Sequence, residues 1–407
     1  MRNFVCLLMA LSCWASVALA AEVQSVTVWA GKLDRSESIV VFPLAGDPLN
    51  TIYELVAQGE RLQVQLLSDK MALFILPELK AGQSKTYTLH SYANAKDAVP
   101  AKNLVRSGNN LTLSSAGRKV FTYNGDLTPL PDGIAAAVQR GGYLHPVLSP
   151  SGKVLSDDYA PNHPHHHGLW AAWTKTEFEG RHPDFWNMQD KTGRVEFVSI
   201  DSTFAGALAC GFAAKHRYVD LTAPGGAKTA LDEIWETTVY RVGVDVKKPY
   251  LRFDVTLTQN CSTNDPLNLP KYLYGGIAFR GRRDWNGKGD ACTFLTSAGK
   301  DRASGNETRA RWCYIGGKVA GEDGTSSLGG VAILCAPSNF RAPQPVRIHP
   351  DMPYFTFSPQ ELGEFKIEPG AAYVSRYRIV TTDGAADKEL FDRLWEDFAQ
   401  PVKVVVK

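Results

Sequence analysis

Leu62-Gln63-Val64-Gln65-Leu66 alternates apolar and polar residues, as a β-strand does when one of its faces is buried. Similar short runs surround it in the first part of the chain, at residues 26–29, 39–42, 72–76 and 86–89. Short strands that recur at close spacing are typical of a β-sandwich. The sequence therefore predicts a small N-terminal β-sandwich domain over residues 21–92, followed by a linker of small and polar residues over 93–103.

Strand-like runs continue through the rest of the chain, for example at residues 237–240, 251–257, 272–279 and 373–380. One segment instead has a helical period, because its apolar residues fall on one face: Leu390, Phe391, Leu394, Trp395 and Phe398. Asp387 can cap the start of this helix, and Pro401 lies just beyond its end. The sequence therefore predicts an all-β protein with a large antiparallel β-sandwich over residues 104–400 and a C-terminal helix.

The first twenty residues have the pattern of a secretory signal peptide. Arg2 supplies a positive charge, residues 4–14 form an apolar stretch, and Ala18-Leu19-Ala20 provides the small residues that a signal peptidase reads. We therefore expect cleavage after Ala20 and a periplasmic or secreted mature protein. No later stretch is long and apolar enough to span a bilayer, so we expect no membrane span after cleavage.

The charges of the chain nearly cancel, with 44 lysines and arginines against 42 aspartates and glutamates. A nucleic-acid partner would require a clustered positive surface, so the balance argues against one.

Five cysteines remain after the expected cleavage: Cys210, Cys261, Cys292, Cys313 and Cys335. None has the CxxC spacing of a zinc knuckle or a thioredoxin-like site. An oxidising compartment permits disulfides, and Cys292–Cys313 is the preferred pair, since the two flank a polar, glycine-containing stretch. Buried free thiols are an equally strong alternative.

Histidines are concentrated in one region of the predicted large domain. Six of the nine lie between residues 145 and 182, namely His145, His163, His165, His166, His167 and His182. If this segment is extended, three histidines of the motif share one face and could hold a divalent metal ion: His163, His165 and His167. Candidates for a further ligand are His145, Glu177 and Asp184.

Pro164 and Gly168 disturb a regular strand and favour a shaped loop that aims the imidazoles. Imidazoles suit general acid–base catalysis, because their usual pKa lies near physiological pH. The catalytic candidates are His163, His165 and His166, with a partner among the carboxylates Asp157, Glu177 and Asp184. A structural, hydrogen-bonded histidine loop is the remaining interpretation.

Aromatic and cationic residues accompany the histidines. Trp170, Trp173 and Trp186 could form a platform on which sugar rings stack, or could fill the core. Further candidates for substrate binding are Arg140, Tyr143, His145, Tyr274, Arg280 and Arg376. An arginine binds a carboxylate with two parallel hydrogen bonds, which would fit an acidic sugar.

Residues 143–152, His163-Pro-His-His-His-Gly-Leu-Trp170 and Asp184-Phe-Trp186 together resemble the PmoA-like family of exported bacterial proteins. Residues 352–360 and 367–384 resemble it as well, so the resemblance covers about residues 140–384. The family's name suggests a methane oxygenase. That activity is not expected here, because membrane methane oxygenases resemble bundles of membrane helices and this sequence has no such helix after its signal peptide.

The resemblance implies a mutarotase-like supersandwich and a place in polysaccharide degradation. It implies five site residues: His163, His165, His166, Trp170 and Trp186. Members of the family often resemble Asp-His-Pro-His-His-Arg, whereas this chain has Asn162 and His167 at the two ends. The resemblance therefore assigns no role to these two positions.

The leading hypothesis is an exported carbohydrate-active enzyme, either hydrolase or lyase, that cleaves glycosidic bonds of an oligo- or polysaccharide without a cofactor. His165 or His166 would act as its base or acid. One alternative is an enzyme that uses the histidine-bound metal ion. The other is a carbohydrate-binding protein without catalysis.

Overall fold

The computed structural model describes residues 21–44, 46, 51–68, 70–93, 102–287, 291–320 and 326–407. The signal peptide predicted over residues 1–20 lies outside the described residues, as does most of the linker predicted over 93–103. Across the described part of the chain, no helix has the length and apolar character needed to cross a membrane.

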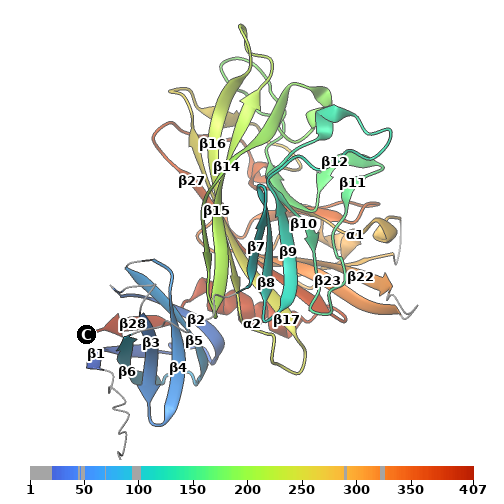
Figure 1. Ribbon diagram of the computed structural model, residues 1–407. Coiled ribbons are helices and arrows are strands. Elements are labelled where there is room, and N and C mark those ends of the chain that lie inside the picture. The colour runs from blue at the N-terminus through green and yellow to red at the C-terminus, as the bar shows by residue number, and fades with distance from the viewer. Residues whose placement is uncertain are drawn as a thin grey trace, which may run out of the picture.

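Two large antiparallel sheets pack face to face and form the main body of the molecule (Figure 1). One sheet has eight strands, in the order β14 (Gly193–Ala205), β15 (Ala209–Asp220), β16 (Lys228–Tyr240), β17 (Tyr250–Cys261), β27 (Tyr373–Asp383), β23 (Ser326–Cys335), β22 (Trp312–Ala320) and β20 (Thr293–Thr296). The other has nine strands, in the order β21 (Thr308–Arg309), β24 (Pro345–Ile348), β25 (Tyr354–Phe357), β19 (Gly276–Arg280), β13 (Leu169–Ala172), β10 (Tyr143–Val147), β9 (Arg118–Asn124), β8 (Asn110–Ser115) and β7 (Leu104–Ser107). The predicted all-β fold with a large antiparallel sandwich is confirmed.

Alternation along the strands explains why the two sheets pack together. In β17, Phe253, Val255 and Leu257 point into the core between the sheets, where they meet Leu169 and Phe279 of the nine-stranded sheet. Successive side chains of a strand point to opposite faces, so the residues between them face outward. The nine-stranded sheet therefore has an inner face in the sandwich core and an outer face that is free to carry a site.

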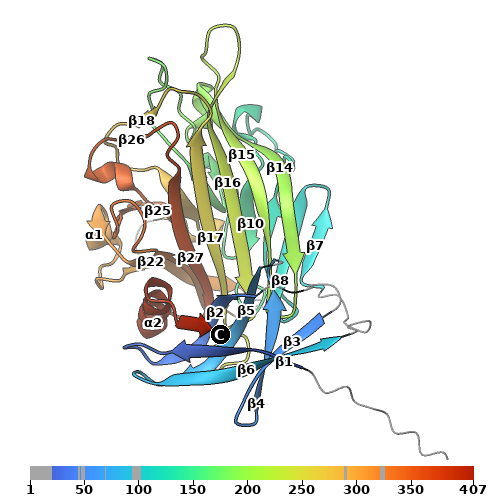
Figure 2. The same ribbon diagram turned by 90° about the vertical axis from the view of Figure 1, so that its left-hand side faces the viewer.

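The predicted C-terminal helix is α2 (Lys388–Ala399). The Asp387 side chain accepts a hydrogen bond from the Leu390 backbone N–H at 3.1 Å, as expected of a helix cap. Phe391 and Leu394 are buried against the outer face of the eight-stranded sheet, and Ile39 of the N-terminal domain packs on the same cluster. The helix therefore lies between the two domains (Figure 2).

The N-terminal domain is one curled sheet of seven strands instead of the two facing sheets expected of a sandwich. Its order is β2 (Arg35–Pro43), β5 (Met71–Leu79), β4 (Glu60–Leu66), β3 (Thr51–Ala57), β6 (Ser84–Ala93), β1 (Ala21–Trp29) and β28 (Lys403–Val406). The edge strands β2 and β28 contact each other, so the sheet curls around its own core. Strand β28 was not predicted; it returns from the end of α2 and adds Val404 and Val406 to that core.

The domains are joined by specific polar contacts. The Gln65 side-chain amide donates to the Ala209 carbonyl at 2.8 Å, and Arg35 pairs with Asp397 of α2 at 2.8 Å.

Smaller elements decorate the sandwich. They are the paired strands β11 (Asp158–Ala160) and β12 (His163–His167), the paired strands β18 (Leu267–Leu269) and β26 (Phe365–Ile367), helix α1 (Arg302–Gly305), and four short 3-10 turns at Ala136–Val138, Met188–Asp190, Arg283–Trp285 and Pro359–Leu362. The strand predicted over residues 272–279 begins only at Gly276. Gly275 has a φ of 146°, and a Cβ there would lie 2.1 Å from Gln360 Oε1, so a glycine bend takes the place of the first half of that strand.

All five cysteines of the described residues are free thiols, and four of them are buried. The predicted Cys292–Cys313 disulfide is therefore wrong, and the alternative of free thiols is confirmed. Cys313 lies in the core between the two sheets, and Cys292 accepts a hydrogen bond from Arg302 at 2.6 Å.

Candidate active site

The histidine motif forms one strand of a hairpin on the outer side of the nine-stranded sheet (Figure 1). Strands β11 and β12 pair antiparallel, with Asp158 opposite His167. Gly168 then turns the chain into β13 with a φ of 52°, and a Cβ at this position would lie 2.1 Å from Leu144 O. Glycine alone fits this turn, so the motif is an extended strand that ends abruptly at Gly168.

Strands β19 and β25 of the sheet, and His349 directly after β24, place polar side chains beside the hairpin. Arg280 of β19 lies opposite Tyr354 of β25, and the His349 backbone N–H donates to the Tyr354 carbonyl at 3.2 Å. Phe279 and Phe355 point into the core between the sheets, so their neighbours Arg280 and Tyr354 point to the outer face. Residues far apart in the sequence thus meet at one place on this face.

The imidazole rings of the site form one contact group. The ring centroids of His165 and His166 are 4.7 Å apart, and His163 lies 5.4 Å from His165 and 5.0 Å from His166. His349 joins the group at 6.2 Å from His163, and Tyr354 lies 4.6 Å from His166. The hairpin and the sheet therefore build one cluster of four imidazoles and a phenol.

These imidazoles are held in their neutral form. Burial, together with the charges of the neighbouring His163, His167 and Arg280, lowers the pKa of His165 to about 3. Burial likewise lowers the pKa of His163 and His166, and that of His349 to about 4. A neutral imidazole has a free lone pair, so at neutral pH these rings can accept a hydrogen bond or a proton from a ligand.

Like the more exposed His163, His165 is an imidazole of the cluster that is available to a ligand. Its side chain is 7% exposed, and it makes no hydrogen bond with any other described residue. By contrast, His349 Nδ1 accepts from the backbone N–H groups of Asp351 and Met352 at 3.1 and 3.0 Å. A second position in the cluster also lacks a partner, since His163 Nδ1 is buried without a hydrogen bond.

Arg280 is a buried cation that contacts His166 and pairs with no carboxylate of the described residues. Its Nη2 donates to Asn162 Oδ1 at 3.0 Å and to Asn286 Oδ1 at 2.7 Å, and its Nε is buried without a partner. Burial lowers the pKa of Arg280 to about 10, which still leaves it charged at neutral pH. Among the described residues no carboxylate lies within ion-pair distance of it, so its positive charge acts on the site.

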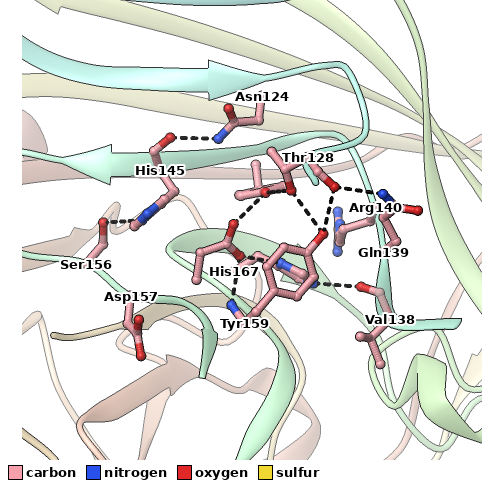
Figure 3. Close-up of polar contacts among 12 residues, drawn as sticks. Asn124, Thr128, Val138, Gln139, Arg140, His145, Ser156, Asp157, Tyr159 and His167 are labelled. Carbon is pink, nitrogen blue, oxygen red and sulfur yellow. Dashed lines mark hydrogen bonds and ion pairs between the residues drawn. The ribbon is translucent and has the colours of Figure 1, made fainter. Parts of the chain in front are cut away.

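His167, at the end of the motif, has a different environment (Figure 3). Its Nδ1 lies 2.7 Å from Asp158 Oδ1, and its Nε2 lies 3.0 Å from the Val138 carbonyl oxygen. Both partners are acceptors, so both ring nitrogens donate and His167 is an imidazolium. Burial opposes ionisation of Asp158, but the hydrogen bond and charge of His167 lower its pKa, and the two form a buried ion pair.

Tyrosines complete this network. The Tyr143 hydroxyl donates to Asp158 Oδ2 at 2.7 Å, and the Tyr159 ring lies edge-on to His167 at 4.9 Å. The Tyr159 hydroxyl is 2.9 Å from Thr128 Oγ1 (Figure 3). The network ties the hairpin to the sheet and to the loop before it, and so fixes the strand that carries His165.

Residues 110–396 match the sequence pattern of a protein family described as a family of unknown function, DUF6807. The match covers well over half of the chain. The chain belongs to this family. No curated protein matches it. The whole of the site, from the histidine hairpin to Tyr354, lies inside the DUF6807 region.

The predicted metal site of the DUF6807 region is not assembled from His163, His165 and His167. Both nitrogens of His167 are engaged with Asp158 and Val138, so His167 offers no lone pair to a metal. In the part of the chain that the structure describes, no group of three or more histidine, cysteine or acidic side chains is arranged to hold a metal ion. This corrects the proposed ligand set.

The three candidate carboxylates do not join the histidine cluster. Asp157 pairs with Arg283 at 3.1 Å, although its backbone N–H donates to the Arg280 carbonyl. Asp184 Oδ1 accepts from two backbone N–H groups, those of Trp186 and Asn187, and so holds a turn. Glu177 lies in a backbone bridge to Asn268, at the strand pair beside the sheet. These positions do not form the paired carboxylates of a glycoside hydrolase.

The tryptophan platform is also corrected. Trp170, Trp173 and Trp186 are 1%, 2% and 2% exposed and belong to the apolar cluster on the outer face of the sheet. The Trp170 ring contacts His166 at 4.9 Å and Trp186 at 5.1 Å. Their faces are covered by protein, so they support the histidines from below and present no stacking surface to a sugar.

The other predicted binding residues fall into different places. Tyr143 belongs to the His167 network, and His145 Nδ1 is bonded to Ser156 Oγ at 2.9 Å. Arg140 is 2% exposed and donates to backbone carbonyls, including that of Gly142 at 3.1 Å. Tyr274 is half-buried, and its ring packs at 5.2 Å against Trp186.

Arg376 is exposed on β27 of the eight-stranded sheet, where it lines a small pocket with Glu236 and Phe398. Its neighbour Tyr377 points into the core between the sheets, so Arg376 points away from the histidine site. Arg376 is therefore removed from the predicted binding residues.

Four residues of the site were not predicted: Asn162, Asn286, His349 and Tyr354. Tyr354 lies in the run 352–360, which carries part of the family resemblance and was the one available signal for it. His349 lies three residues before that run. Their neighbours in the site are set by the pairing of β25 with β19, and no local pattern encodes that pairing.

Proposed function

We propose that this protein is an exported carbohydrate-active enzyme that cleaves glycosidic bonds of an acidic polysaccharide by elimination. The observation that carries the proposal is a neutral imidazole, His165, in a cluster whose next histidine, His166, has its Nδ1 3.5 Å from Nη1 of the buried cation Arg280, which pairs with no carboxylate of the described residues. A base and an uncompensated positive charge suit a reaction in which a proton leaves carbon and negative charge develops.

In this reaction His165 takes the proton from the carbon next to the sugar's carboxylate. The electron pair of that C–H bond forms a double bond to the neighbouring ring carbon, and the glycosidic C–O bond of that carbon breaks. The leaving oxygen takes a proton from the enzyme, so no water is consumed. Tyr354 is the proposed donor, because burial raises the pKa of its phenol and keeps it protonated.

Arg280 is a positioning residue in this scheme. Its side chain is fully buried, so it acts through its charge and through Asn162 and Asn286, which it holds at the site. The PmoA-like pattern often has aspartate where this chain has Asn162. An aspartate there would neutralise Arg280, whereas the amide leaves the positive charge in place.

Two further arguments support the carbohydrate and export parts of the proposal. The motif's resemblance to exported PmoA-like proteins implies polysaccharide degradation, and large β-sandwiches of this type also resemble those of sugar-acting enzymes. The pattern of the first twenty residues is that of a signal peptide.

The test uses the chain from Ala21 to Lys407 with a panel of acidic and neutral oligosaccharides. Mass spectrometry reports whether fragments carry an added water, and ultraviolet absorbance reports the new double bond. We expect fragments of acidic substrates without added water. His165→Gln should abolish them while the thermal unfolding curve stays that of the wild type.

His182→Gln is the matched control, because His182 lies in the same stretch of sequence but is exposed and has no contact with the other imidazoles. Fragments with added water would overturn elimination in favour of hydrolysis. An absence of fragments over the whole panel would overturn the enzyme assignment and leave a carbohydrate-binding protein.

A further inference from the structure

An open groove of about 710 Å³ lies next to the histidine site. It is formed by β20, α1 and β24, and the lining residues used below are Cys292, Phe294, Arg302, Asn306, Arg347 and Asp351. Sites for small ligands commonly have volumes of about 300–1,000 Å³. The groove is therefore large enough for one or two sugar units.

The groove and the histidine site share structural elements. Arg347 and Ile348 line the groove, and the next residue, His349, belongs to the imidazole cluster. On the other side, Arg302 Nη1 donates to the carbonyl of Gly287 at 3.0 Å, and Gly287 follows Asn286, which accepts from Arg280. The positive charge of Arg347 also contributes to lowering the pKa of His349, as expected for close neighbours. A chain of linked sugars could therefore occupy both places at once.

Two guanidinium groups in the groove have no carboxylate partner among the described residues. Arg302 is held by the carbonyls of Gly287 and Pro350, each at 3.0 Å, and lies 4.8 Å above the Phe294 ring. Arg347 Nη1 donates to Asn306 Oδ1 at 2.9 Å. In both arginines Nε is buried without a hydrogen bond, and neither lies within ion-pair distance of a carboxylate among the described residues. Their positive charges are therefore available to a ligand.

The acidic residues of the groove are already engaged. Asp301 caps α1, where its Oδ1 accepts from the Ser304 backbone and hydroxyl at 2.9 and 2.7 Å. Asp351 lies at the edge of the groove and has its own partner. The arginines are fixed by neutral groups, and Asp301 is used as a helix cap.

We infer that this groove is a subsite for an anionic group of the substrate, a carboxylate or a sulfate, on a sugar unit adjoining the one that reacts at His165. The inference rests on the proposed function, since it takes the histidine cluster as the reacting centre. Arg347 and Arg302 would bind the anion with charge-assisted hydrogen bonds, and the sugar ring would lie along the groove.

Binding, measured separately from turnover, tests this inference. The His165→Gln variant, which should bind without cleaving, is titrated by calorimetry with a uronate oligosaccharide, its methyl ester, and a sulfated neutral oligosaccharide of equal length. We expect the free acid to bind on the order of ten- to a hundredfold more tightly than the ester, because hydrogen bonds to a charged group typically contribute a difference of this size. Comparison of the uronate with the sulfated sugar tells which anion the groove prefers.

Arg347→Gln and Arg302→Gln are then added to this background. Each should reduce the preference for the acid over the ester, and Arg347→Lys should retain part of it. Arg106→Gln is the matched control, because Arg106 is exposed on β7 at the opposite edge of the same sheet. Equal binding of acid and ester would overturn the subsite, as would a preference that survives both substitutions.

Failure of the proposed function would look different. A wild-type protein that cleaves none of the oligosaccharides but binds the acid through Arg347 would retain the anion subsite and lose the enzyme assignment. Cleavage without any preference for acidic ligands would retain the enzyme assignment and lose the anion subsite.

Discussion

Replacing Asp158 by asparagine should destabilise the protein far more than the loss of an ordinary surface charge. Asp158 accepts from His167 Nδ1 at 2.7 Å, from the Tyr143 hydroxyl at 2.7 Å and from the Tyr159 backbone N–H at 3.1 Å. Asparagine keeps the shape of the side chain but leaves the His167 imidazolium without its counter-charge.

Removing one partner of a buried ion pair typically costs about 3–5 kcal/mol. For a domain of about 300 residues, that loss corresponds to a decrease in melting temperature of roughly 5–8 °C. The pKa of Asp158 is lowered from its usual value of 3.8, so its contribution is complete at neutral pH and is lost as pH falls through its lowered pKa. The difference between wild type and variant should therefore be largest at neutral pH and shrink below about pH 4.

Calorimetric or denaturant unfolding of both proteins across this pH range measures the effect. Asp201→Asn is the matched control, because Asp201 pairs with Lys215 at 2.9 Å on the exposed surface, where such pairs contribute at most about 1 kcal/mol. Nitrogen chemical shifts of His167 provide a second measurement, since the imidazolium has protons on both nitrogens. Equal stabilities of Asp158→Asn and wild type at neutral pH, or a His167 ring with a single proton, would refute the ion pair.

Four further outcomes are expected. If His165 is the base, kcat/KM should show no loss as the pH falls through 6.5, where an ordinary histidine takes up its proton, because the pKa of His165 is lowered to about 3. An inflection of kcat/KM near pH 6.5 would contradict this role. Arg280→Met should abolish activity but leave the unfolding temperature equal or higher, since a buried unpaired charge is removed; a strongly destabilised variant would assign Arg280 to the fold. Trp170→Ala should lose about 3–5 kcal/mol of stability in denaturant unfolding, because the ring is buried core, and a change below 1 kcal/mol would restore the exposed platform. Alkylation of the denatured, unreduced protein should label both Cys292 and Cys313, and mass spectrometry that finds this pair unlabelled would show a disulfide.

Local sequence patterns predicted some elements of the structure and missed others. Alternation in residues 251–257 and the apolar face of residues 390–398 predicted strand β17 and helix α2, because both patterns follow from local backbone geometry. The concentration of histidines correctly pointed to one place in the chain where imidazoles gather. Strand β28 was missed, because four residues after a helix have too little pattern to reveal that they return to another domain.

The roles of individual side chains depended on contacts that no local pattern contains. His163, His165 and His167 are equally spaced, yet His167 is an ion-pair partner of Asp158 while His165 has no hydrogen bond to another described residue. The difference arises because β11 aligns Asp158 with His167 and not with the other two.

The sequence by itself determined the all-β class and the C-terminal helix, since each depends on the period of residues a few places apart. It also located the histidines, but it favoured a loop where the structure has strand β12. Tertiary structure alone decided that Arg280 and Tyr354 meet His166, that His349 meets His163, and that Trp170 is covered. These outcomes depend on the register between strands more than a hundred residues apart, and register is set by the packing of whole sheets. Burial and charge pairing follow from that packing, and they decide which histidines are bases and which one is a cation.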